Sequence, residues 1–288
     1  MYEVKMIRNN EDRTGPRSTG ADEVPAEIRQ MMNPMDFVAP TEFVELPSLG
    51  KGYAEAHPLY GQESIEIRFM TAKEKDMLTS ETLLKKGVAI ERVLQSIVKD
   101  KNINVGTLLS GDRNAILISA RASAYGKWYK TSINCPHCGA KNKKAFDLYK
   151  PAVYHGDDFE DYQIETTNKG TYKVTLPYSK LVIECRLLTG DDEVSIIKHA
   201  KNKKNKSEQG LLLSQMALYI VSVNGYDDQK SILYTIQNMV AADSRYLRSA
   251  VKAFTPQIKI VSDFECNSCG YEQELEVPFS ADFFWPDR

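Results

Sequence analysis

The sequence predicts an α+β fold made of two similar, helix-rich repeats, each ending in a β-ribbon that carries a CxxCG turn. Three observations support this: an internal duplication, a matching order of strand and helix signals in its two copies, and the paired CxxCG motifs. The chain has 288 residues, enough for one large domain or two ordinary ones. We expect a flexible arm over residues 1–40, a first repeat over 41–155 and a second repeat over 156–288.

Charge and hydropathy narrow the class of protein. There are 37 Lys and Arg against 39 Asp and Glu, a net charge of −2, whereas nucleic-acid-binding domains usually have a pI above about 9. The start lacks the apolar core of a signal peptide, and the longest uncharged run, residues 210–226, is too short and polar to cross a bilayer. We therefore expect no membrane contact and a reducing cytoplasm, where grouped cysteines indicate metal ligands rather than disulfides.

The first 40 residues differ in composition from the rest. Residues 8–27 are rich in polar residues, Gly and Pro, and they nearly lack large apolar side chains. Such a segment cannot bury enough surface to offset the entropy lost on ordering. Met31, Met32 and Phe37 follow as a small apolar group, which is either a loosely packed lead-in to the fold or a peptide that docks on a partner.

The duplication is visible in two places. Ile, Glu, Arg and Thr recur in register when residues 65–75 are aligned with residues 183–193. Asp, Cys, Cys and Gly recur in register when residues 112–139 are aligned with residues 243–270. Either match alone could arise by chance, but two matches in the same order favour a duplication.

Each copy opens with an extended segment, residues 64–69 in the first and 180–187 in the second, followed by the start of a helix. The start is marked by Thr and an acidic residue three positions later. This spacing is typical of a capping box, which satisfies free N–H groups in the first helical turn. The two pairs are Thr71 with Glu74 and Thr189 with Asp192.

Helices are expected next in each copy. In the first, apolar residues recur at helical spacing between Ile90 and Val98. In the second, residues 210–223 are apolar on nearly all sides, which predicts a buried helix. Asp112 and Asp243 are good N-cap residues, so we expect each of them to cap a further helix.

Two strands joined by a CxxCG turn are expected at the end of each copy. The residues beside the second turn alternate between apolar and polar, as in a half-buried strand. The expected strands are residues 128–134 and 144–149 in the first copy, and 257–264 and 272–279 in the second.

The two CxxCG motifs indicate a metal site. Two residues between the cysteines let both thiolates face one ion, and the glycine permits the tight turn around it. The spacer between the motifs is far longer than the roughly 15–20 residues of one compact ribbon, which is explained if each repeat contributes one motif. We expect one structural Zn²⁺ in a closed four-thiolate site that clasps the repeats together. The ligands would be Cys135, Cys138, Cys266 and Cys269.

Two alternatives for the motifs stay open: the zinc is shared between chains, or the motifs are metal-free remnants. A redox pair is not favoured, because the CPHC string precedes a strand instead of opening a helix. Cys185 takes the place of Ile67 in the first copy and is expected to be a buried core thiol. The sequence has no phosphate-binding loop or catalytic motif, so we expect no enzyme activity and no small-molecule substrate.

Several short motifs follow one another in residues 41–150. They are ELPSLGKGY at 45–53, IEIRFMTAKEKDML at 65–78, LLKKG at 83–87, LLSGDRN at 108–114 and CPHCG at 135–139. In this order they resemble the T4-type bacteriophage baseplate protein family, specifically the subunits that assemble the baseplate hub. The second repeat resembles this order of motifs more weakly. Its residues 176–179 (LPYS) match the LPS segment only in part.

The resemblance implies a non-enzymatic structural or assembly protein of a contractile phage tail, acting in or on the baseplate hub as an adaptor or assembly chaperone. Its partners would be other tail and hub proteins. It would assemble in the host cytoplasm, and the resemblance leaves open whether it stays in the tail baseplate of the virion. Partner contacts are expected in the arm and in the LPSLGKGY segment, at Met31, Met32, Phe37, Pro47, Ser48, Gly50 and Tyr53.

The alternative function is a zinc-ribbon nucleic-acid-binding protein such as a late-gene regulator. Three lysines follow the first CxxCG turn, and two aromatic residues precede it. The balanced overall charge and the acidic second ribbon argue against it. The residues in question are Lys141, Lys143, Lys144, Trp128 and Tyr129.

Overall fold

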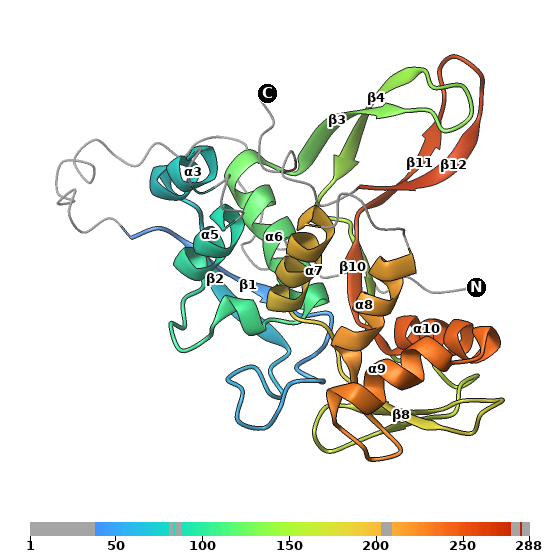
Figure 1. Ribbon diagram of the computed structural model, residues 1–288. Coiled ribbons are helices and arrows are strands. Elements are labelled where there is room, and N and C mark those ends of the chain that lie inside the picture. Colours follow the sequence, from blue (N-terminus) through green and yellow to red (C-terminus); the bar gives the residue numbers. More distant parts are fainter. Residues whose placement is uncertain (1–37, 81–82, 84–87, 203–208, 278–282, 284–288) are drawn as a thin grey trace, which may run out of the picture.

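The computed structural model describes residues 38–80, 83, 88–202, 209–277 and 283. Within these residues, seven α-helices, one short 3-10 helix and several small antiparallel sheets form one body, from which two β-ribbons project (Figure 1). The mixture of helices and antiparallel strands confirms the α+β class. Met31, Met32, Phe37 and the rest of the expected arm up to residue 37 lie outside the described residues.

The first half of the chain runs from a hairpin through helices to the first ribbon. Its elements are β1 (Thr41–Glu45), β2 (Ser64–Arg68), α3 (Ala72–Thr79), α5 (Ala89–Ile97), η2 (Val105–Thr107), α6 (Ser110–Tyr125), β3 (Trp128–Asn134), β4 (Lys141–Asp147) and β5 (Ala152–Tyr154).

The second half has a related order of elements. They are β6 (Ile164–Thr166), β7 (Tyr172–Thr175), β8 (Val182–Cys185), α7 (Gly190–Asn202), α8 (Gln209–Tyr219), β9 (Ile220–Val223), α9 (Gln229–Asn238), α10 (Ala241–Phe254), β10 (Gln257–Lys259), β11 (Val261–Glu265) and β12 (Glu272–Glu276). Strands β6 to β9 form a four-stranded sheet, and the other sheets have two strands each.

The hairpins β1–β2 and β7–β8 have matching registers. Each pairs a valine with the isoleucine that opens residues 65–75 or residues 183–193, and both side chains of each pair are buried. The pairs are Val44 with Ile65 and Val174 with Ile183. The segment after the first strand of each hairpin is the LPS segment in the first half and residues 176–179 in the second.

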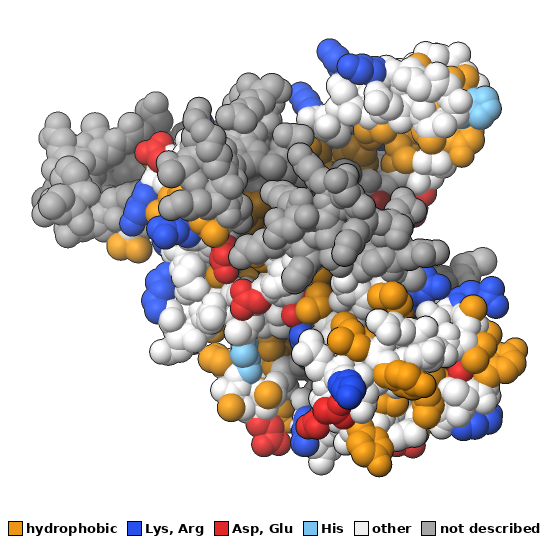
Figure 2. Space-filling model, viewed as in Figure 1, with side chains coloured by type: hydrophobic (Ala, Val, Ile, Leu, Met, Phe, Trp, Pro, Cys, Tyr) orange, Lys and Arg blue, Asp and Glu red, His pale blue; other side chains and the backbone are white. Residues whose placement is uncertain are grey.

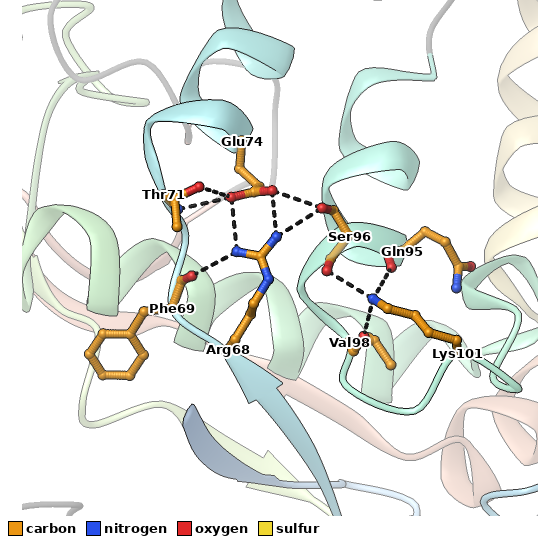
Figure 3. A network of polar contacts seen from close by, with 8 residues as sticks. All are labelled: Arg68, Phe69, Thr71, Glu74, Gln95, Ser96, Val98 and Lys101. Carbon is orange, nitrogen blue, oxygen red and sulfur yellow. Dashed lines mark hydrogen bonds and ion pairs between the residues drawn. The ribbon is translucent and has the colours of Figure 1, made fainter. Parts of the chain in front are cut away.

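The expected capping box at the start of α3 is present, and it belongs to a larger network (Figure 3). Glu74 is fully buried and accepts hydrogen bonds from the backbone N–H and the hydroxyl of Thr71, at 2.9 and 2.6 Å. Arg68, at the end of β2, donates two bonds to the same carboxylate, at 2.6 and 3.0 Å, and Ser96 of α5 donates a third contact at 2.7 Å. One carboxylate therefore ties a strand end and two helices together.

The start of α7 repeats this arrangement with a shorter acid. Asp192 accepts from the N–H and the hydroxyl of Thr189, at 2.9 and 3.0 Å. Arg186, which follows β8, donates two bonds to Asp192 at 2.7 and 2.8 Å. Arg68 and Arg186, which occupy matching positions in residues 65–75 and 183–193, thus make the same contact in both halves.

Two expectations about helices were wrong in detail. The expected helix over residues 210–223 is α8 only as far as Tyr219, and the run IVSV at 220–223 is strand β9, consistent with the strand preference of Val and Ile. Asp112 and Asp243 are not N-caps, because α6 and α10 begin earlier, at Ser110 and Ala241. Both aspartates lie in the first helical turn and bind a loop of their own half instead.

The two halves interlock. Strand β5, after the first ribbon, pairs with β10 of the second half, and the expected strand over 257–264 breaks at Ile260 into β10 and β11. Near α6 and α7 the N–H of Ser110 donates to the carbonyl of Leu188 at 3.0 Å, and the N–H of Gly190 donates to that of Leu108 at 2.9 Å. One hydrophobic core runs through both halves, and none of the described helices has the length and apolar character needed to cross a membrane.

The last described residue packs against the first half. Phe283 is fully buried, and its ring lies 5.1 Å from that of Tyr129 in β3. The Nε–H of Arg121, itself buried in α6, donates to the Phe283 carbonyl at 2.8 Å. The core of the first half is therefore completed by a residue from the far end of the second.

Candidate metal centre

The two CxxCG turns have the same backbone geometry. The N–H of Gly139 donates to the carbonyl of Cys135 at 2.8 Å, and the N–H of Gly270 donates to that of Cys266 at 2.9 Å. Both glycines have positive φ, 73° and 67°, a conformation that residues with a Cβ adopt at a cost. The glycine in each motif thus lets the chain turn back while both thiols point to the same side.

The four cysteines of the motifs meet where the tips of the two ribbons come together (Figure 1). The Sγ atoms of Cys135 and Cys269 are 3.8 Å apart, those of Cys138 and Cys266 are 3.6 Å apart, and all four lie within 4.8 Å of one another. Zinc–sulfur bonds of about 2.3 Å in a tetrahedron place the sulfurs about 3.8 Å apart. The cluster therefore has the donor set and the dimensions of a four-thiolate metal site.

Burial divides the four thiols into two pairs. Cys135 and Cys266, the first cysteine of each motif, are 2% exposed and pack with Phe264 in a small apolar cluster separate from the main core. Cys138 and Cys269 are exposed at the ribbon tips. One side of the site is thus walled by apolar groups, while the other faces solvent.

Backbone and side-chain donors surround Cys266. The N–H groups of Ser268 and Cys269, with a smaller contribution from Asn142, lower the pKa of the Cys266 thiol to about 6. The amide of Asn142 lies 3.5 Å from this sulfur. Because the thiolate is the form that binds metal, these donors favour the state that a metal site requires.

Asn142 is a functional residue that the sequence analysis missed. It lies on β4 of the first ribbon, is 4% exposed, and its Oδ1 accepts from the N–H of Asn267 in the opposite turn at 2.9 Å. His137 stacks on Tyr271 of the other turn, with ring centroids 5.4 Å apart, and lies outside the sulfur cluster. The one signal for Asn142 is a polar residue at a position where the strand alternation expects an apolar one.

The remaining cysteine lies elsewhere. Cys185 is fully buried on β8, as expected for a core thiol, and burial raises its pKa above the ordinary range of a thiol. It pairs with Tyr172 across the β7–β8 hairpin. A thiol in this environment is inert and contributes nothing to the metal cluster.

The LPSLGKGY segment is held by a buried aspartate. Asp112 accepts hydrogen bonds from the backbone N–H of Ser48 at 2.9 Å, from its hydroxyl at 2.6 Å and from the hydroxyl of Tyr53 at 2.7 Å. Burial raises the pKa of Asp112, which these bonds partly offset. Pro47 and Gly50 are buried in the same segment. The expectation that these residues contact a partner stays a prediction.

The equivalent place in the second half has an equivalent contact. Asp243 accepts from the backbone N–H groups of Tyr178 and Ser179, at 3.0 and 2.9 Å. These residues belong to the faint LPYS trace, whose Tyr178 side chain is 70% exposed. The aspartate therefore binds the loop after the first hairpin strand in both halves, which the sequence signal for an N-cap did not predict.

Comparison with protein families gives one match. The family model of the T4 bacteriophage base plate protein matches residues 39–285, a span that contains both hairpins, both ribbons and all four clustered cysteines. Comparison with curated proteins and with solved structures yields no match.

Proposed function

The chain belongs to the T4 bacteriophage base plate protein family, and we propose that it acts in or on the baseplate hub as an adaptor or assembly chaperone. The observation that carries the proposal is the extent of the family match, which leaves little of the chain for another role. The partners would be other tail and hub proteins. We propose a non-enzymatic role, assembled in the host cytoplasm, because a baseplate component works through the surfaces that it presents.

We infer that the chain is a duplicated unit, with repeats over residues 41–155 and 156–288. The inference is supported by the matching hairpin registers, the two arginine–acid capping networks and the two loop-binding aspartates. The CxxCG turns, which coincide in backbone hydrogen bonding, support it as well. Each repeat would then contribute half of the metal site.

We propose that the four cysteines hold one structural Zn²⁺, which joins the two ribbon tips. Four thiolates at these separations fit a closed tetrahedral site, which binds the ion without leaving a position for a substrate. Two ligands come from each of the proposed repeats, so the ion would fix the position of one repeat relative to the other. Neighbouring tail proteins would meet a rigid pair of repeats.

The partner contacts are proposed for the arm, at Met31, Met32 and Phe37, and for the LPSLGKGY segment. In that segment the side chains of Ser48 and Tyr53 are bound to Asp112. Their contribution to a partner contact would be to fix the shape of the loop. Lys51, which is exposed in the same segment, would be available at the surface.

Quantitative mass spectrometry of finished phage particles and of assembly intermediates from the same infection tests the proposal. A fixed ratio to known tail proteins in finished particles supports a built-in adaptor. Presence in intermediates alone supports an assembly chaperone that is released. Absence from both, with the protein found elsewhere in the infected cell, would overturn the baseplate role.

A further inference from the structure

The two ribbons expose faces of opposite charge. In β3–β4 the pairing register places Lys130, Lys141 and Lys143 on one face, all three exposed, together with Trp128, which is 49% exposed. The residues between them point to the other face, where Tyr129, Asn142 and Phe146 are buried. We call the exposed side the lysine face.

The solvent face of β11–β12 is acidic at the same positions. Asp263 and Glu265 of β11 are exposed and pair directly with Glu274 and Glu272 of β12, so all four carboxylates share one face. Phe264, between the two acids of β11, is 2% exposed and points to the other face. We call the exposed side the acidic face.

Glu276, at the base of the acidic face, pairs with Lys259 at 2.8 Å, but within the described part of the chain the four carboxylates nearer the tip have no such partner. Like charges directly opposite one another destabilise an antiparallel pair, and this face contains two such pairs, Asp263 with Glu274 and Glu265 with Glu272. Among the described residues, no Lys or Arg forms an ion pair with any of these four carboxylates. The arrangement costs stability unless cations from outside this set neutralise it.

A groove of about 490 Å³ lies against this ribbon. It is lined by the four residues of the acidic face and by Phe264, Gln273 and Lys144, which lie on the opposite faces of their ribbons. The ammonium group of Lys144 donates to the backbone carbonyl of Asp263 at one side of this groove. A groove of this size can accept further lysine side chains, whose long stems would lie along its walls.

The spacing of the two faces is complementary. Lys141 and Lys143 are two residues apart on β4, as Glu272 and Glu274 are on β12. Both strands rise about 3.4 Å per residue, so each pair of charges is about 6.8 Å apart along its strand. In Figure 2 blue side chains lie on the upper edge of the projecting ribbons, and orange side chains with a few red ones lie beneath them. One chain thus carries two charged ladders of matching repeat, exposed together.

We propose that the protein self-associates head to tail, with the lysine face of one copy docked on the acidic face of the next. A second copy is the occupant that fits both faces at once, since it offers a cationic ladder to the acidic face and an anionic one to the lysine face. The contact joins two different surfaces, so copies add one after another. They form a closed ring if the rotation from each copy to the next adds up to a full turn, and an open filament if it does not. This inference goes beyond the baseplate role and does not depend on it.

The test is the mass of the purified, zinc-loaded full chain by analytical ultracentrifugation. At about 0.1 M salt, where charges act over about 10 Å, we expect the mass to rise with concentration above the 32.5 kDa of one chain. At about 1 M salt, where the range falls to about 3 Å, the mass returns to one chain. A single-chain mass at both salt concentrations would overturn the proposal.

Charge reversal identifies the surfaces. The triple variant Lys130→Glu, Lys141→Glu, Lys143→Glu and the triple variant Asp263→Lys, Glu272→Lys, Glu274→Lys should each be monomeric, because each has like charges on both faces. An equimolar mixture of the two should associate again, because every face then meets its opposite. Failure of the mixture to associate, with both variants folded by circular dichroism, would contradict the proposed pairing.

A matched control changes the same total charge elsewhere. Lys73, Lys75 and Lys169 are exposed outside the ribbons, and their replacement by Glu should leave self-association unchanged. Loss of association in this control would show that net charge, and not the two faces, drives self-association, and it would overturn the proposal. A monomeric wild type whose lysine face instead binds duplex DNA in a gel shift would overturn self-association in favour of a nucleic-acid partner.

Discussion

The guanidinium of Arg68 binds the fully buried carboxylate of Glu74 through two N–H groups, at 2.6 and 3.0 Å. The pair joins the end of a strand to the first turn of the next helix, and Arg186 and Asp192 make the same connection in the second half. Two parallel N–H···O bonds fix both the distance and the angle between the groups. The strand-to-helix connection is therefore rigid in both halves.

Replacing Glu74 with Gln should lower the free energy of unfolding by about 3 kcal/mol, because it leaves the half-buried Arg68 without the opposite charge of a fully buried carboxylate. Urea unfolding followed by circular dichroism measures the loss. Glu66→Gln is the matched control, since Glu66 pairs with Lys99 at the surface, at 3.2 Å, and its loss should barely change stability. Equal effects of the two changes would contradict a special role for Glu74.

Stability should fall in acid partly through these two carboxylates. Burial alone would raise the pKa of Glu74 and of Asp192, but hydrogen bonds from Arg68, Arg186 and the capping threonines hold both pKa values below the ordinary range. A lowered pKa contributes stability above the unfolded-state value, about 4, which is lost as the pH falls further. Urea midpoints at several pH values should show a shallower acid decline for Glu74→Gln than for wild type.

Asp112 has a raised pKa, so its contribution to stability changes with pH in the opposite direction. The free energy of unfolding must therefore be compared between variant and wild type at each pH. Subtracting the two curves removes the contribution of every group that both proteins share. A difference that stays constant between neutral pH and pH below the unfolded value would contradict the assignment to Glu74.

Tyr53→Phe should cost about 2 kcal/mol, because a bond to a charged acceptor is lost at a buried site. The Tyr53 hydroxyl donates to Asp112 and also accepts from the N–H of Leu109 at 3.1 Å. Thermal or urea unfolding is the measurement. Tyr60→Phe is the control, since Tyr60 is 48% exposed and its change should stay within about 0.5 kcal/mol.

Zinc removal should loosen the contact between the ribbons. We expect one zinc per chain by mass spectrometry under native conditions, a lower melting temperature with a strong chelator, and loss of the metal in Cys135→Ser. Metal binding in small zinc domains is coupled to folding by about 10 kcal/mol or more. Cys185→Ala removes a buried thiol outside the cluster and should keep its zinc.

The metal content also separates the alternatives. One zinc for two chains would indicate a site shared between copies, and a metal-free protein with an unchanged melting temperature would indicate that the turns are remnants. Cys135→Ser with full zinc content would exclude this cysteine as a ligand.

Local patterns predicted the parts of the fold that depend on neighbouring residues. The capping threonines at 71 and 189 mark real helix starts, and the apolar spacing from Ile90 predicted α5. The four cysteines, in two motifs far apart in sequence, meet as the paired CxxCG motifs predicted. Each of these signals depends on residues within a few positions of one another, or on a short motif that the sequence contains twice.

The parts that the sequence analysis missed depend on distant residues. Aspartate is a favoured N-cap residue, but Asp112 does not cap its helix, which begins at Ser110. Its carboxylate instead accepts three hydrogen bonds from Ser48 and Tyr53. The run at 220–223 forms a strand because the neighbouring strand β8 is there to pair with it. Asn142 has its role because it contacts a turn 125 positions further along the chain. The local sign of these contacts is slight: in β4 it is a polar residue at position 142, where the alternation expects an apolar one.

The burial of Phe283 against α6 also determines when, during synthesis, the protein can complete its folding. The hydrogen bond from Arg121 to its carbonyl joins residues that are 162 positions apart. On a ribosome, α6 and β3 emerge long before residue 283 has been synthesised, and contacts of such high sequence separation form late. The core of the first half can therefore reach its final packing only after the last part of the second half has been synthesised. Any neighbour that recognises the finished surface is recruited only after translation has passed that point.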